Sequence, residues 1–116
     1  MQIVRIYADA AGESHFEELQ FPLHDRGEIG RLSELIPASG VIIRETPPTY
    51  AYDWHTAPQR QIVVLLVGSI EIEASDGEKR QLHAGDLLFA EDTAGRGHRT
   101  RTLGGVTRSS LFITLD

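Results

Sequence analysis

Two histidines and a glutamine form the best candidate site in this sequence. His55 and Gln61 come just before IVVLLV (62–67), a segment too apolar to be solvated on either face of a strand. His98 follows EDTAGRG (91–97), an acidic and glycine-rich turn. Imidazole nitrogens and an amide oxygen can bind a metal ion, move a proton or hydrogen-bond a polar ligand. We therefore expect His55, Gln61 and His98 to converge on one pocket.

The alternation of side chains along two strands supports this convergence. Every second side chain of a strand faces the same way, so Gln61 shares its face with Val63 and Leu65. In 97–103 two arginines alternate with His98 and two threonines, and neutral side chains suit a protein interior better than charged ones. Gln61 and His98 are therefore predicted to point inward.

A strand just before them carries three aromatic residues. Tyr50, Tyr52 and Trp54 share one face of the predicted strand 50–55, and His55 lies on the other. Alternation does not tell which face is inward. Tyr52 and Trp54 are candidate ligand-binding residues, with packing as the alternative role.

The elements that position these residues are strands. The 11 glycines punctuate the chain at short intervals, and the pattern between them has a period of two. The one stretch with helical spacing, 30–36, is ended by Pro37 and is expected to form a turn or two of helix. We expect an all-β fold with short strands at 2–7, 15–21, 41–46, 50–55, 60–67, 69–74, 79–83, 86–90, 97–103 and 106–115.

Two pairs of turn residues predict hairpins. Asp76-Gly77 precedes the strand 79–83, and Gly104-Gly105 precedes the last strand. Both pairs suit two-residue turns, whose central positions need positive φ. We expect the strands on either side of each pair to be antiparallel neighbours.

The composition describes one folded domain, 1–116, with N-terminal strands and a loop over 1–40 and a core over 41–115. With 41% apolar and 24% charged residues the chain suits a single core, and no apolar run reaches the about 20 residues of a membrane helix. The N-terminal MQIVRIYADA alternates like a strand and not like a signal peptide, so we expect a cytoplasmic protein without a membrane partner.

The net charge and the absence of cysteine restrict the possible partners and metal ligands. The net charge of −6 argues against nucleic acid as a partner. The one basic cluster, Arg96, Arg99 and Arg101, is expected to face solvent. Without cysteine, only nitrogen and oxygen ligands are available to a metal.

Over residues 41–115 the chain resembles the cupin superfamily. The first cupin motif has the form G(X)5HXH(X)3-4E(X)6G. Gly68 fits its last glycine, Gln61 stands at the glutamate position, and His55 lies between the two histidine positions. The resemblance implies a jelly-roll barrel, also called a double-stranded β-helix, with a pocket at one mouth.

The second cupin motif has the form G(X)5PXG(X)2H(X)3N. Gly85 fits its first glycine, Glu91 stands at the proline position, and His98 resembles the histidine after a longer turn. Cupins with intact motifs bind one divalent metal through three histidines and the acid. The resemblance thus implies a metal site of at most His55, Gln61 and His98, for Fe, Mn, Ni or Zn, acting on a small organic acid, sugar or phenolic substrate. A nearby carboxylate would complete a two-histidine, one-carboxylate arrangement, and the candidates are Asp53, Glu91 and Asp92.

Two alternatives use no metal. In one, the same side chains bind or sense a polar small molecule and no reaction follows. In the other, His55 or His98 is the base of acid/base catalysis, oriented by a carboxylate such as Asp53. The remaining histidines are expected to be surface or structural residues: His15, His24 and His83.

A homodimer is also expected. The strand 62–67 is apolar on both faces, so its outer face needs cover that a partner subunit could supply. The N-terminal strand MQIVRIYA could cross to the sheet of that partner.

Overall fold

The structure, a computed structural model that describes all residues 1–116, has strands as almost its only regular secondary structure, which confirms the all-β expectation. Its one helix is a short 3-10 turn, η1 (Gly27–Ile29), and no helix is long and apolar enough to cross a membrane. The strands are β1 (Ile3–Ala8), β2 (Ser14–Glu18), β3 (His24–Asp25), β4 (Arg31–Leu32), β5 (Ala38–Thr46), β6 (Ala51–His55), β7 (Gln61–Val67), β8 (Ser69–Ala74), β9 (Lys79–His83), β10 (Leu87–Ala90), β11 (His98–Leu103) and β12 (Arg108–Leu115).

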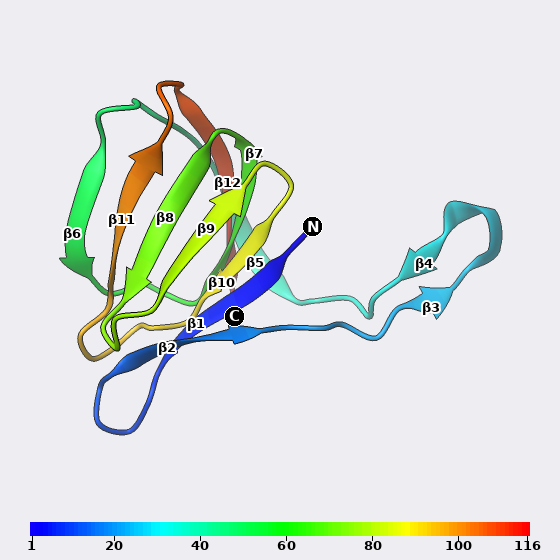
Figure 1. Cartoon of the computed structure of the whole chain (residues 1–116). Helices are drawn as coiled ribbons and strands as arrows, with labels where there is room; N and C mark the ends of the chain where they lie inside the picture. Colours follow the sequence, from blue (N-terminus) through cyan, green and yellow to red (C-terminus); the bar gives the residue numbers. More distant parts are fainter.

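Two sheets face each other, with the hydrophobic core between them (Figure 1). Six strands form the larger sheet in the order β2-β1-β10-β7-β12-β5, and four form the smaller sheet in the order β6-β11-β8-β9. Ile6 and Leu65 of the larger sheet belong to the same buried cluster as Ile72 and Leu82 of the smaller. No strand pair joins the two sheets by hydrogen bonds, so they do not close into the expected barrel.

Every strand expected from alternation is present, within a few residues of its expected bounds. The predicted strands 69–74 and 79–83 coincide with β8 and β9. In β8 the buried isoleucines alternate with the more exposed Glu71 and Glu73, because one face packs on the core and the other meets solvent.

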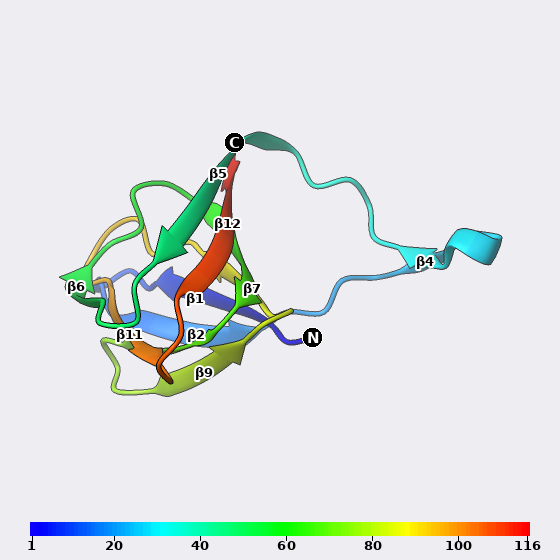
Figure 2. The same cartoon turned by 90° about the horizontal axis from the view of Figure 1, so that it is seen from above.

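Residues 22–37 form an arm that projects from the body of the molecule (Figures 1 and 2). In this arm β3 pairs with β4, and no residue is buried. The helix expected over 30–36 is wrong, because Arg31 and Leu32 form β4 and the following residues have no regular structure. A short helix needs tertiary packing of its apolar face, and Leu35, 91% exposed, has no core to pack on.

One of the two predicted hairpins is present. β8 and β9 pair antiparallel, but the loop between them has three residues, 75–77, since Ala74 and Glu78 form the closing hydrogen bond and Gly77 alone has a positive φ. The expected two-residue turn is therefore wrong in detail. Gly104-Gly105 connects β11 to β12, which lie in different sheets, so the second predicted hairpin is wrong.

The outer face of the larger sheet carries apolar side chains across five strands. Cross-strand pairs join the following residues into one row: Ile43, Leu111, Val64, Leu87 and Ile3. At the edge strand β5, Val41 and Ile43 are 62% and 82% exposed. The N-terminal strand β1 lies between β2 and β10 of its own chain, and so is not free to cross to a partner as expected.

Candidate functional site

A cavity of about 80 Å³ lies between the two sheets, with room for several water molecules or a small organic molecule. Its walls are largely apolar and include Val63, Leu65, Ile72 and Phe112. The cavity brings together the three residues expected to converge: His55, Gln61 and His98.

Gln61 and His98 point inward, as alternation predicted. Gln61 begins β7 with 7% of its surface exposed, and Val63 and Leu65 follow it on the cavity side. His98 begins β11 with 6% exposed, whereas the arginines of that strand pair with glutamates of β8 on the solvent side. Each of the two residues therefore enters the cavity from the first position of its strand.

A glycine allows His98 to lie next to His55. Gly97 has a φ of +74°, and a Cβ atom added there would collide with the backbone of His55 and Thr56. His98 stands opposite His55 in the β6–β11 pair, and the two ring centroids are 4.4 Å apart. The buried hydroxyl of Ser14 donates a hydrogen bond of 2.7 Å to the Gly97 carbonyl and so holds this turn in place.

Asp92 is the carboxylate that belongs to the site. It is 0% exposed, and its Oδ2 accepts a hydrogen bond of 2.5 Å from Nδ1 of His98. Its backbone carbonyl accepts a hydrogen bond from Ala57, which ties the 91–97 turn to the segment after β6. Nδ1 of His98 is thus engaged by Asp92, and Nε2 is the ring nitrogen that remains for a ligand.

The other two candidate carboxylates are engaged elsewhere. Glu91 forms ion pairs of 2.5 Å with both Arg5 and Arg60. Asp53 is exposed on β6, and its carboxylate accepts a hydrogen bond from the backbone N–H of Trp54. Sequence spacing could not choose among the three carboxylates, because the choice depends on how the 91–97 turn folds back over β6.

His55 is oriented in a way that matches His98. Its Nδ1 lies 2.8 Å from the backbone carbonyl oxygen of Asp53, which can only accept, so Nδ1 donates and Nε2 keeps its lone pair. Burial lowers the pKa of His55, and the nearby His98 lowers it further. The His55 imidazole is therefore neutral at pH 7.

The aromatic residues of this region have different places. Tyr50 lines the cavity. Alternation predicted Tyr52 and His55 on opposite faces, but a register shift in the β6–β11 pair brings their ring centroids to 3.9 Å. Tyr52 thus lies beside the site, whereas Trp54 packs under an arginine outside it. Neither lines the cavity, and ligand binding by these two stays a prediction.

The donor set falls short of a resident metal site. His55 and His98 offer two Nε2 atoms and Gln61 an amide oxygen, without a negative charge. Nowhere in the chain do three His, Asp or Glu side chains stand where they could hold one ion together. Asp92 is already hydrogen-bonded to Nδ1 of His98, so its carboxylate does not add a ligand beside the two Nε2 atoms. Fe, Mn, Ni and Zn sites generally use three or more imidazole, carboxylate or thiolate ligands, and His55, Gln61 and His98 supply only two of that kind.

Two arginines of the cavity were missed by sequence reasoning. Arg44 comes from β5 and Arg108 begins β12, and their guanidinium groups lie 5.2 Å and 5.8 Å from the centroid of the Tyr50 ring. Alternation carried a signal, because Arg108 shares its face with Ser110 and Phe112. Arginine is rarely buried in proteins, so the burial of an arginine at the start of a strand was not expected.

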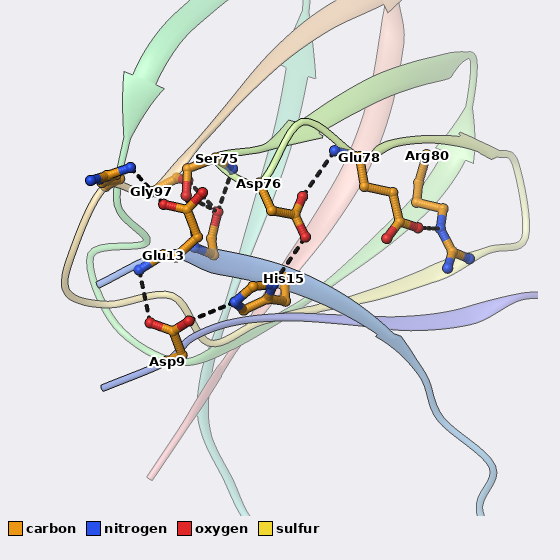
Figure 3. A network of polar contacts seen from close by, with 10 residues as sticks. Asp9, Glu13, His15, Ser75, Asp76, Glu78, Arg80 and Gly97 are labelled. Atoms are coloured by element: carbon orange, nitrogen blue, oxygen red, sulfur yellow. Dashed lines mark hydrogen bonds and ion pairs between the residues drawn. The ribbon is translucent and has the colours of Figure 1, made fainter. Parts of the chain in front are cut away.

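The other histidines lie outside the cavity, as expected. His15 bonds Asp9 at 2.7 Å and Asp76 at 2.9 Å, and so joins the β1–β2 and β8–β9 hairpins (Figure 3). His24 lies in the arm, and His83 bonds a serine hydroxyl of β8.

Comparison with known proteins identifies no family for this chain. No protein-family model and no curated protein matches the sequence. One similar solved structure is the crystal structure of protein NMB1881 from Neisseria meningitidis, with 18% identity, 86% of each chain covered and a TM-score of 0.49. Such a distant likeness carries no argument about family or function.

Proposed function

We propose that this chain is a cupin-like protein that binds a small organic molecule between its sheets and moves a proton on it without a metal. His98, held by Asp92, is the proton acceptor, and His55 is the neighbouring neutral imidazole. The observation that carries the proposal is the buried hydrogen bond between His98 and Asp92 at the edge of an apolar cavity. A histidine with Nδ1 on a carboxylate and Nε2 free is arranged as a general base.

The reaction class is proton transfer at a carbon next to a carbonyl group, as in isomerisation or epimerisation. Nε2 of His98 takes the proton, the electrons of the broken C–H bond form the enolate C=C bond, and the negative charge moves to the carbonyl oxygen. Asp92 offsets the positive charge that His98 gains. Return of the proton to carbon restores the imidazole, so the cycle needs no oxidant or reductant.

Gln61 and His55 have supporting roles in this reaction. The Gln61 amide lies in the cavity beside the histidines and can donate a hydrogen bond to the enolate oxygen. The neutral His55 lies beside His98, and its Nε2 lone pair can accept a hydrogen bond from the ligand. Electrostatic interactions are stronger in an apolar cavity than in water, which favours both roles.

Hydrogen–deuterium exchange tests the proposal. Small keto acids such as pyruvate and 2-oxobutyrate, and neutral ketones such as acetone and dihydroxyacetone, are incubated with the protein in D2O and followed by proton NMR. We expect the protein to speed exchange of at least one compound, and His98→Gln to remove about 100- to 10,000-fold of that acceleration. His83→Gln, a histidine outside the cavity, is the matched control and should keep it.

Other outcomes identify the rival functions. Ligand binding without any exchange would leave a binding or sensing protein. A divalent metal held by His55, Gln61 and His98 is the second candidate: both histidines bond a carbonyl or carboxylate through Nδ1, as metal-binding histidines generally do, but the set lacks the anionic ligand that such sites usually contain. Near-stoichiometric metal in protein purified without chelator, lost in His98→Gln, would support it over metal-free catalysis.

A further inference from the structure

Arg108 is a buried arginine without a partner. It is 6% exposed, and its Nη1 makes no hydrogen bond. Its side chain enters the cavity next to Gly68, where β7 has ended, so it lies at the opposite end of β7 from Gln61. A buried guanidinium normally has a carboxylate or several hydrogen-bond acceptors around it.

The protein has enough acidic side chains to pair with its arginines. The net charge is −6, and every other arginine of the two facing sheets and their connections is ion-paired with a glutamate. This includes the cluster that was expected to face solvent: Arg96, Arg99 and Arg101. Outside the arm, the two cavity arginines alone are left without an ion pair.

Arg44 adds a second positive charge to the same place. It lines the cavity from the edge strand β5, and its guanidinium lies over the rings of Tyr50 and Phe112, at 5.2 Å from each centroid. Burial lowers the pKa of Arg108, and the charge of Arg44 lowers it further. Two like charges are therefore held together without a counterion from the protein.

We propose that Arg108 and Arg44 bind the carboxylate of a small organic acid, whose remaining atoms extend along Val63 and Leu65 toward His98. A planar guanidinium holds a carboxylate through two parallel hydrogen bonds, which also fixes the direction of the ligand. The inference that a reaction follows at His98 rests on the proposed function, whereas the anion site itself does not. With about 80 Å³ available, the ligand is an acid of a few non-hydrogen atoms.

Paired ligands test the site by isothermal titration calorimetry. Acetate, lactate and benzoate are compared with acetamide, lactamide and benzamide, which have similar shapes and no charge, and inorganic phosphate is titrated beside them. We expect at least one carboxylate to bind at least about tenfold more tightly than its amide, and Arg108→Met to weaken it about 10- to 100-fold. Arg101→Met, a surface arginine paired with Glu71, should bind like the parent.

Arg108→Lys keeps the charge without the planar fork, and an intermediate affinity is expected. His98→Gln should bind the carboxylate normally while losing proton exchange, which separates failure of the reaction from failure of the anion site. Three results would overturn the anion site: no carboxylate binds, the amide binds as well as the acid, or folded Arg108→Met keeps the preference. Tighter, Arg108-dependent binding of phosphate would replace the carboxylate with a phosphate ligand.

Discussion

Gly97→Ala tests whether a close backbone approach builds the histidine pair. Gly97 and Gly104 both have a φ of +74°, so an alanine at either site adopts a left-handed conformation that costs about 1–2 kcal/mol. At Gly104 an added Cβ would meet nothing within 4 Å, whereas at Gly97 it would overlap the carbonyl group of His55. Forcing strands apart in a packed interior costs about 1–3 kcal/mol more.

Equilibrium unfolding in urea measures both variants. We expect Gly104→Ala to lose about 1–2 kcal/mol of unfolding free energy, and Gly97→Ala to lose about 2–5 kcal/mol. Imidazole NMR signals of His55 and His98 should move in Gly97→Ala alone, because the strain separates β6 from β11. Equal losses in the two variants would refute the reasoning, since the backbone conformation would then account for the whole effect.

Three further predictions concern charge and assembly. Arg108→Met removes an unsatisfied buried guanidinium, so it should stabilise the protein by about 1 kcal/mol, or raise Tm by about 4 °C, in a buffer without carboxylates or phosphate. A loss of stability in thermal unfolding would contradict this. The hydrogen bonds to Asp9 and Asp76 raise the pKa of His15, so their stabilisation is fully present below about pH 6.5 and is lost as the pH rises through the raised value. The Tm difference between parent and His15→Gln should therefore shrink from pH 5 to pH 9, and a constant difference would argue against it. Light scattering should give the mass of a homodimer, whose interface is formed by the outer apolar face of the larger sheet and by the arm. Replacing 22–37 by a short glycine linker should give monomers. A monomeric parent protein would contradict this prediction.

Alternation predicted most of the fold because it reports which side of each strand is buried. It placed β7 and β11 correctly and turned Gln61 and His98 inward. It failed where pairing is irregular, since the shift in the β6–β11 register moves Tyr52 to the same side as His55. Sequence periodicity also failed in the arm, where it predicted a helix and where no residue is buried.

The partners of the site residues could not be predicted for a different reason. Asp92 meets His98 through the path of a turn, and neither spacing nor composition specifies that path. The burial of Arg108 could not be predicted, because burying an unpaired charge costs free energy and a charged residue is therefore expected at the surface. Exceptions to such rules are expected where a site is built for something other than stability.

The buried side-chain atoms without a hydrogen-bond partner belong to residues that line the cavity or directly adjoin residues that do. Three buried side-chain atoms have no hydrogen-bond partner: Asp92 Oδ1, Arg108 Nη1 and Thr46 Oγ1. Thr46 stands opposite Arg108 in the β5–β12 pair, so two of these atoms are at the arginine end and the third is at the histidine end. Each such group costs about 1–3 kcal/mol of stability, and folding alone gives no reason to keep that cost at both ends of one cavity. A ligand with an anionic group at Arg108 would give the arginine end of the cavity the partner that the protein itself does not supply.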